Sequence, residues 1–143
     1  MNDSLVDDYI NSNEIIKNKN VMPQNLEAEQ SLLGSILFDN NILEDLPTNF
    51  SANYFFDPLH SSIYDASISL INNGRLADPL TLKNYLSDNK HNLDIDVEQY
   101  LIDLRDGVLS LSKARFYAEE IRNCYIRRSL IIIADELIHK ANH

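Results

Sequence analysis

The chain has 143 residues and a mass of 16.4 kDa, with 44% apolar and 24% charged residues. A chain of this size and composition fits one globular domain, which buries roughly 68 to 70% of the surface that the unfolded chain exposes. The single cysteine, Cys124, excludes an intramolecular disulfide and a Cys-x-x-Cys zinc or redox site. The N-terminus is acidic where a secretory signal is basic, and no apolar run approaches the roughly 20 residues of a membrane span. We therefore expect a cytoplasmic protein that is neither exported nor embedded in a membrane.

The charge is strongly negative and unevenly distributed. Twenty-two acidic against twelve basic residues give a formal net charge of −10 and a pI near 4.6. Residues 1–111 hold 18 acids and 6 bases, a net of −12, whereas residues 112–143 hold 4 acids and 6 bases, a net of +2. Because phosphate backbones repel an acidic surface, direct binding of nucleic acid is disfavoured.

The N-terminal part of the chain divides into a polar arm and a first helix. Residues 1–21 are rich in asparagine and polar, which favours turns over helix, so we predict a flexible arm. Asn25 is a suitable N-cap, and acidic residues follow it in the first turn. The apolar spacing predicts a helix from there to about Asp39. Its apolar face contains Leu26, Leu33 and Leu37, flanked by Leu32 and Ile36.

Short helices are predicted through the middle of the chain. One runs from Asn41 to Leu46 and ends before a proline. The pairs Asp57-Pro58 and Asp78-Pro79 each place a capping carboxylate before a proline at the first helical position. Gly74 closes the helix that Asp57 starts, and the apolar spacing over 97–108 predicts another helix.

The C-terminal segment is predicted to form one long helix. Ser112 is a candidate cap, and the roughly thirty residues from there to about Ala141 contain no Gly or Pro and would span roughly 45 Å. No segment alternates with the period of a strand. We therefore predict an all-α fold: a flexible arm (1–21), a globular head of five or six short helices (22–111), and one long C-terminal helix (112–143).

The long helix is apolar around most of its circumference near its C-terminal end. Four consecutive apolar residues, 130–133, cover most of one turn. The series Ile126, Leu130, Ile133 and Leu137 fits one neighbouring element, which leaves Ile131 and Ile138 to contact a second one. We predict that this stretch meets a helix outside this chain or another subunit. In the alternative, the helix lies in a groove of the head and is buried on both sides.

The sequence offers only weak matches to known catalytic motifs. None of the three glycines fits a phosphate-binding P-loop, and Gly34, in the middle of a helix, is better explained by close helix packing. His60 precedes two serines, but helical neighbours diverge by about 100°, so we interpret it as a partly buried packing residue and not as a hydrolase base. The sequence assigns no catalytic residue.

Metal and nucleic-acid sites are alternatives of lower weight. His139 and His143, with Glu136, have a spacing that can chelate a metal, and a small metal-dependent enzyme is one hypothesis. Cys124 is expected to be a small core or interface residue. The acidic groups are interpreted as solvated faces: Asp94, Asp96 and Glu98, and Asp103 and Asp106. The nearest approach to a nucleic-acid patch is a set of three arginines, Arg122, Arg127 and Arg128, interleaved with Tyr117 and Tyr125. These arginines are expected to form intersubunit ion pairs, and a helical DNA-binding protein is the alternative function.

Several motifs together resemble one family. The segment 22–34, MPQNLEAEQSLLG, resembles the opening motif of the N-terminal domain of DnaB replicative helicases. Further landmarks follow in the order of that family: Tyr54-Phe55-Phe56, His60, Ile63-Tyr64, Asp78-Pro79-Leu80-Thr81-Leu82, Tyr100-Leu101, Tyr117-Ala118 and Arg127-Arg128-Ser129-Leu130-Ile131. The resemblance covers about residues 22–143. It departs at Asp96-Val97-Glu98, where relatives often carry paired glycines.

The resemblance implies a helical head followed by the first arm of an antiparallel hairpin, with the second arm and a RecA-like motor beyond residue 143. It implies a role in DNA replication through assembly of a hexamer collar and docking of primase; whether a helicase loader also docks here stays open. No cofactor is expected in this part, because ATP and Mg²⁺ would bind the motor, and DNA would be contacted through the full-length protein. Glu27 and Tyr100 are candidates for the primase-facing surface. Candidates for hairpin or subunit contacts are Ile126, Leu130, Ile131, Leu137 and Ile138.

Overall fold

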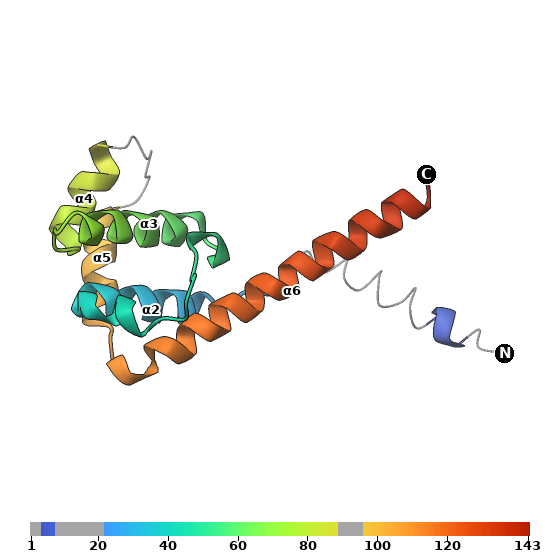
Figure 1. Cartoon of the computed structure of the whole chain (residues 1–143), viewed down its shortest axis with the longest axis horizontal. Coiled ribbons are helices and arrows are strands. Elements are labelled where there is room, and N and C mark those ends of the chain that lie inside the picture. Colours follow the sequence, from blue (N-terminus) through green and yellow to red (C-terminus); the bar gives the residue numbers. More distant parts are fainter. Residues whose placement is uncertain (1–3, 8–21, 89–95) are drawn as a thin grey trace.

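The computed structural model describes residues 4–7, 22–88 and 96–143, and helices joined by short loops make up this part of the chain (Figure 1). No strand occurs among these residues, and the all-α prediction is confirmed. The α-helices are α2 (Leu26–Phe38), α3 (Pro58–Asn72), α4 (Pro79–Asp88), α5 (Val97–Asp106) and α6 (Ala114–Ala141). Three 3₁₀ turns join them: η1 (Asn40–Asp45), η2 (Ala52–Tyr54) and η3 (Leu111–Lys113). The predicted arm lies outside the described residues except for 4–7.

The predicted helix starts are confirmed by their caps. The Asn25 side chain accepts a hydrogen bond from the Ala28 N–H at 2.9 Å, and the Asp57 carboxylate accepts one from the Leu59 N–H at 2.8 Å. Asp78 caps α4 through the Thr81 N–H at 2.8 Å. After α3, Gly74 has a φ of +73°, as its predicted role in ending that helix requires.

α2 lies at the centre of the head, with α5 and α6 packed against it and α3 alongside. It is buried on more than one side, and Leu32, Leu33 and Ile36 are at most 1% exposed. Where α2 meets α5, a Cβ built on Gly34 would lie 2.2 Å from the Leu104 carbonyl oxygen. The expected close helix packing at Gly34 is therefore confirmed.

Two local predictions need correction. The short helix predicted from Asn41 to Leu46 is a 3₁₀ turn that begins one residue earlier, at Asn40. Ser112 does not cap the long helix: α6 begins at Ala114 after η3, and its start has no side-chain cap. The Ser112 hydroxyl is instead hydrogen-bonded to the Ser110 hydroxyl at 2.8 Å.

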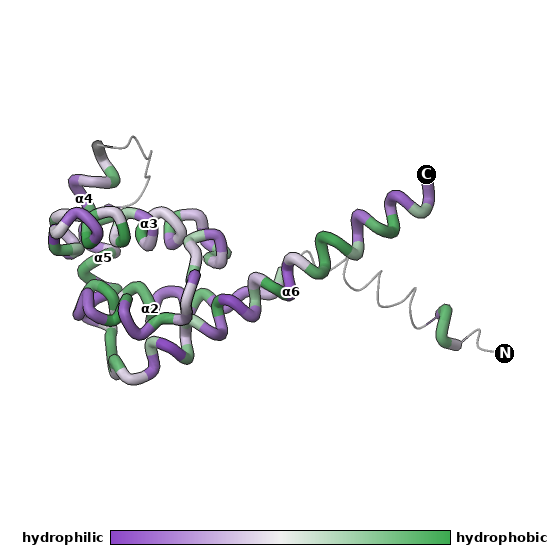
Figure 2. Tube along the Cα trace, in the orientation of Figure 1, coloured by the Kyte–Doolittle hydropathy of each residue, from purple (hydrophilic) through white to green (hydrophobic). Residues whose placement is uncertain are grey.

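α6 leaves the head as a projecting arm (Figure 1). Its 28 residues correspond to roughly 42 Å at 1.5 Å per residue. Its first half packs against the head through a single buried stripe: Ala114, Ala118, Ile121, Cys124 and Arg128. No residue of α6 beyond Arg128 is buried, although Figure 2 shows apolar residues continuing along the projecting half. The alternative that the head buries this half on both sides is therefore wrong.

None of the helices in the described ranges combines the length and the apolar character needed to cross a membrane.

Candidate interaction site

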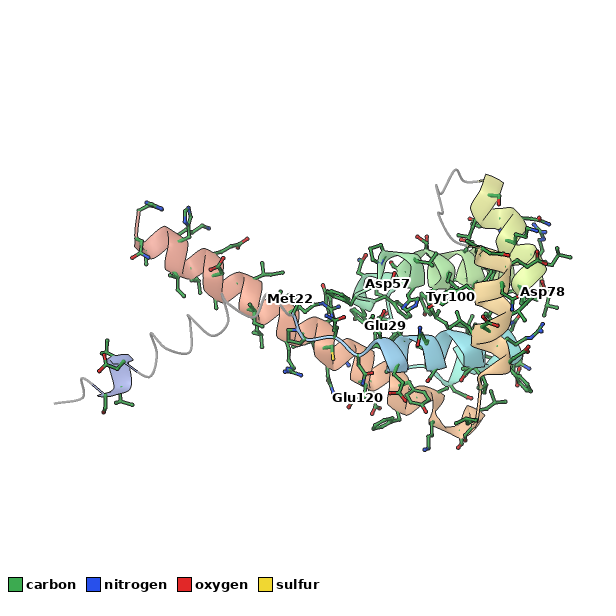
Figure 3. All side chains as sticks on the ribbon, turned by 180° about the vertical axis from the view of Figure 1, so that it is seen from behind. Met22, Glu29, Asp57, Asp78, Tyr100 and Glu120 are labelled. Atoms are coloured by element: carbon green, nitrogen blue, oxygen red, sulfur yellow. The ribbon has the colours of Figure 1, made fainter. Side chains whose placement is uncertain are left out.

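A buried polar network joins α2, α3 and α5. The Glu29 side chain is 1% exposed, and its carboxylate accepts hydrogen bonds from the Phe56 N–H at 2.8 Å and the Asp57 N–H at 3.3 Å. The Nδ1 atom of His60, also 1% exposed, lies 2.9 Å from a Glu29 carboxylate oxygen. Figure 3 shows Glu29, Asp57 and Tyr100 gathered where the three helices meet. A carboxylate buried with three donors is well compensated for its desolvation.

The network continues from His60 to the edge of the head. The Nε2 atom of His60 lies 2.6 Å from the Tyr100 hydroxyl, and the two rings are nearly parallel. The Gln30 amide donates to the same hydroxyl at 3.2 Å. Glu29 and Tyr100 occupy both ring nitrogens of His60, which is buried, as predicted, and more deeply than expected. The Ser61 hydroxyl donates to the Ala52 carbonyl and not to His60.

The Tyr100 hydroxyl is held in its protonated form. Partial burial raises its pKa, and the nearby carboxylates of Asp57 and Glu29 raise it further, while the hydrogen bond from Gln30 acts in the opposite direction. A protonated hydroxyl both donates and accepts, so Tyr100 can be a link in a chain of hydrogen bonds.

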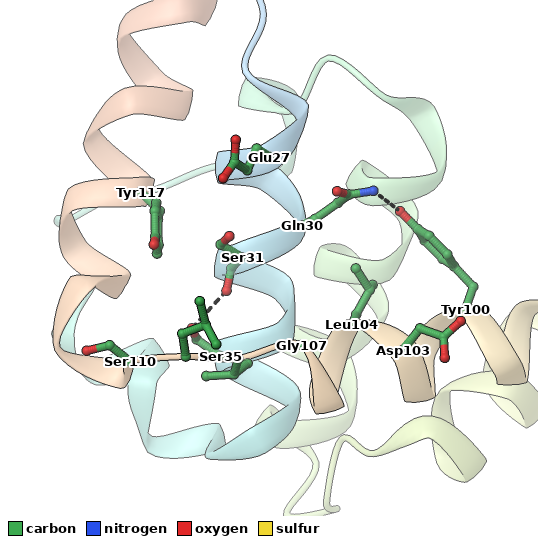
Figure 4. Close-up of a pocket in the computed structure, with 12 residues that line it drawn as sticks. Glu27, Gln30, Ser31, Ser35, Tyr100, Asp103, Leu104, Gly107, Ser110 and Tyr117 are labelled. Carbon is green, nitrogen blue, oxygen red and sulfur yellow. Dashed lines mark hydrogen bonds between the residues drawn. The ribbon is translucent and has the colours of Figure 1, made fainter.

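A cleft of about 420 Å³ opens beside this network, between α2, α5 and the start of α6 (Figure 4). It is lined by Glu27, Gln30, Ser31, Ser35, Tyr100, Asp103, Leu104, Gly107, Val108, Leu109, Ser110 and Tyr117. Glu27 and Tyr100 are 73 positions apart in the sequence, and the structure brings both onto this cleft. Sequence reasoning missed Gln30 and Asp103. Their spacing of three residues from Glu27 and Tyr100, respectively, places them on the same helix faces and could have found them.

The structure places Arg128 differently from expectation. It is 8% exposed, and its guanidinium donates to the carbonyls of Pro23 and Tyr54, each at 2.8 Å. It also lies over the ring of Phe56, 5.4 Å from the centroid. The prediction that Arg128 forms intersubunit ion pairs is wrong, because these intramolecular contacts hold its guanidinium. The same contacts remove it from the alternative DNA-binding patch and leave exposed Arg122 and Arg127.

Four of the five candidate contact residues of α6 lie on its projecting half, and Ile126 lies just before Arg128. Ile126 is 40% exposed, Leu130 59% and Leu137 62%, whereas Ile131 and Ile138 are half-buried. By their helical spacing, Ile126, Leu130 and Leu137 share one face of α6, and Ile131 and Ile138 share a second face about 100° away. The structure therefore places them at a surface separate from the cleft of Glu27 and Tyr100.

The structure also places the other residues that the sequence singled out for metal binding, core packing or solvated faces. Cys124 is buried against the head, as expected for a small core residue. The rings of His139 and His143 are 4.4 Å apart, but the described residues contain no group of three metal-ligating side chains. Asp94 lies outside the described residues. Among the other acidic candidates, Asp96 caps α5, Glu98 pairs with Lys83, Asp103 accepts from Gln99, and Asp106 pairs with Arg105.

The fold and the site define a helical domain with a projecting helix, a closed polar network and an open cleft. The family model described as "DnaB-like helicase N terminal domain" matches residues 21–123. The chain belongs to this family.

Individual relatives agree. The chain is 32% identical over 137 residues to the replicative DNA helicase DnaB of Rickettsia prowazekii, a match that covers 96% of this chain and 28% of the relative. It is 30% identical over 124 residues to the DnaB of Treponema pallidum, covering 87% of this chain and 28% of the relative. The crystal structure of the N-terminal domain of DnaB helicase from Mycobacterium tuberculosis superposes with a TM-score of 0.75 at 28% identity, covering 86% of this chain and 89% of that one. The chain thus spans little more than a quarter of the length of these helicases.

Proposed function

We propose that this chain is a non-catalytic assembly and docking module of a replicative DNA helicase. In this proposal, α6 contributes to the contacts that build the hexamer, and the head docks primase. The observation that carries the proposal is the projecting half of α6, where large apolar side chains are exposed although the head has a well-packed core. Relatives named as replicative DNA helicases support the setting.

The energetic argument for assembly rests on apolar area. A buried Leu or Ile side chain contributes roughly 1.5–3 kcal/mol relative to an exposed one. Leu130 is 59% and Leu137 62% exposed, so each gains more than half of this when another helix covers it, and Ile126, at 40%, gains somewhat less. Their summed contribution is about 2–5 kcal/mol before the cost of association is subtracted. The half-buried Ile131 and Ile138 add to the same surface.

The assembly proposal is tested by sedimentation velocity over a concentration series. We expect the chain to self-associate at high concentration, and a Leu130→Ser/Leu137→Ser variant to shift towards monomer without losing helix content. Glu119→Ser, a change at an exposed position on the same helix, is the matched control and should behave like the wild type. Two results together would refute this role: the chain stays monomeric at millimolar concentration, and the double substitution leaves the hexamer of the full-length helicase unaffected.

The docking proposal places primase at the cleft of Glu27 and Tyr100. Its support is that both candidates for the primase-facing surface, which the family resemblance suggested, line one cavity of about 420 Å³, a volume within the range of binding sites in proteins. Isothermal titration with the C-terminal domain of primase from the same organism is the test. Glu27→Lys should weaken binding at least tenfold, whereas Glu44→Lys, at an exposed position on η1, should not.

Absence of binding by both this chain and the full-length helicase would exclude primase as the partner. The same proteins serve to test the proposed lack of catalysis: this chain alone should release no phosphate from ATP. Binding of a helicase loader would be measured in the same titration.

A further inference from the structure

The hydrogen bonds that end at the cleft form a chain whose direction depends on which nitrogen of His60 carries the proton. Gln30 Nε2 can only donate, so it donates to the Tyr100 hydroxyl oxygen at 3.2 Å. At the other end, the Glu29 carboxylate accepts the two backbone N–H groups and therefore accepts from His60 Nδ1 as well. With the ring proton on Nδ1, the Nε2 atom of His60 accepts from the Tyr100 hydroxyl, 2.6 Å away. In this arrangement each hydrogen bond in the series from Gln30 through Tyr100 and His60 to Glu29 has one proton and one acceptor.

This direction determines what Tyr100 offers to the cleft. In this arrangement its only proton points inwards to His60 and one lone pair accepts from Gln30, so the hydroxyl keeps one acceptor position for a ligand. The charged groups around His60 and Tyr100 are the carboxylates of Glu29 from α2 and Asp57 from the start of α3. Both carboxylates are negative, so they favour hydrogen-bond donors that point away from the cleft and towards them.

The rest of the cleft wall has matching chemistry. Glu27 and Asp103 add carboxylates on either side, and Asp103 uses one oxygen to accept from Gln99 at 2.8 Å. The described lining contains no Lys, Arg or His. Figure 4 shows Gln30 of α2 reaching towards Tyr100 of α5, with Asp103 beside Tyr100 on α5, and the Glu27 carboxylate on the side of α2 that faces Tyr117. The charged side chains on these two walls, Glu27 and Asp103, are both acceptors.

Apolar side chains lie at the other end of the cleft, towards the loop before α6. Leu104 and Val108 form part of the lining, and Leu109 is fully exposed, at 101%. A long basic side chain buries its methylene stem against such a surface while its charged head makes hydrogen bonds. The acidic head, with a net charge of −12 over residues 1–111, also attracts a cation at longer range.

We propose that this cleft accepts the basic side chain of a partner protein, with the Tyr100 hydroxyl, Glu27 and Asp103 as its acceptors, and that His60 and Glu29 are positioning residues that hold Tyr100 in its accepting orientation. The inference rests on the proposed docking function and specifies the chemistry of the partner. The occupant is a segment with an arginine or lysine next to apolar residues.

The test uses three blocked tripeptides that differ only in the central residue: acetyl-Leu-Arg-Leu-amide, acetyl-Leu-norleucine-Leu-amide and acetyl-Leu-Glu-Leu-amide. Each is titrated into ¹⁵N-labelled chain and followed by NMR. We expect the arginine peptide to shift the amides of Glu27, Tyr100 and Asp103 and to bind about tenfold more tightly than the norleucine peptide, in a salt-dependent manner. Equal binding of all three, shifts confined to other surfaces, or preference for the glutamate peptide would overturn the proposal.

Two variants separate positioning from folding. Tyr100→Phe removes the acceptor and should reduce the preference for arginine over norleucine to about twofold, while binding of the norleucine peptide is unchanged. Tyr125→Phe, on α6 and outside the lining of the cleft, is the matched control and should keep the preference. His60→Gln should lose the preference as Tyr100→Phe does. If His60→Gln fails to fold, Tyr100→Phe alone decides, and an unchanged preference in it refutes the assignment.

The primase titration distinguishes the two proposals. If the arginine peptide binds selectively but primase does not bind, the docking function fails while the chemistry of the cleft stands. If primase binds and both Tyr100→Phe and the peptides show no preference for a cation, the function stands and this inference fails.

Discussion

Replacing Gly34 with alanine tests the closest approach between α2 and α5. A Cβ at this position would lie 2.2 Å from the Leu104 carbonyl oxygen and 3.0 Å from Val108 Cγ2. The valine methyl group can turn away, but the carbonyl belongs to the backbone of α5 and cannot. The helices must therefore separate by about 1 Å to restore an ordinary contact distance.

Two effects of opposite sign set the magnitude. Alanine is favoured over glycine within an exposed helix by about 1 kcal/mol. Overpacking a close contact costs about 1–3 kcal/mol, and a clash with backbone belongs at the upper end of that range. The clash outweighs the helix propensity, so we expect Gly34→Ala to lower the free energy of unfolding by about 2 kcal/mol and the Tm by roughly 5–10 °C.

Circular dichroism melts and urea titrations measure both quantities, and the other two glycines provide controls. A Cβ at Gly107 has its nearest atom, the Asp103 carbonyl oxygen, at 3.1 Å, and φ there is −81°, so Gly107→Ala should change stability by less than about 0.5 kcal/mol. Gly74 has no atom within 4 Å but a φ of +73°, so Gly74→Ala should cost about 1 kcal/mol through backbone strain alone. A Gly34→Ala variant as stable as the wild type would refute the reasoning.

Three further changes have expected outcomes. Arg128→Met removes two hydrogen bonds from a charged donor to the carbonyls of Pro23 and Tyr54, and should lower the urea unfolding free energy by about 2–4 kcal/mol; wild-type stability would contradict this. Burial raises the pKa of Tyr64 to about 12 from a value of 10.0 in the unfolded chain, so its contribution to stability is complete below pH 10 and is lost as the pH rises towards 12. Tyr64→Phe should flatten the fall of the unfolding midpoint over that interval, and an identical pH profile would show that another group is responsible. Spectrophotometric titration should also show Tyr100 ionising above its ordinary range, and a normal titration of every tyrosine would contradict its burial.

Local chemistry explains which parts of the fold could be predicted from the sequence. The starts of α3 and α4 depend on an aspartate followed by a proline, and both determinants lie within one turn of the helix they begin. The end of α3 depends on one glycine with a positive φ. The start of α6 was mispredicted at Ser112, because the partner of its hydroxyl, Ser110, belongs to the preceding loop.

The network at the site could not be predicted, since its members are distant in sequence. His60 is 31 positions from Glu29 and 40 from Tyr100, and Arg128 is 105 from the carbonyl it binds at Pro23. Helical periodicity gives the face on which each of these residues lies, but not the helix that it meets. A buried glutamate on the apolar face of α2 is the one local anomaly that could have indicated a partner.

The continuity of α6 has a mechanical consequence. The helix runs from the core of the head, where Ile121 is 1% exposed, into the projecting half without a proline or glycine between Ala114 and Ala141. If the projecting half of α6 tilts, it pivots at Arg128, the last residue of the helix that is buried against the head. The 13 residues beyond Arg128 extend roughly 20 Å, so a tilt of about 10° at the anchor displaces the tip by about 3–4 Å. A force on the far end of α6 therefore acts on the backbone carbonyls of Pro23 and Tyr54, next to the segment that carries the Glu29 contacts at Phe56 and Asp57.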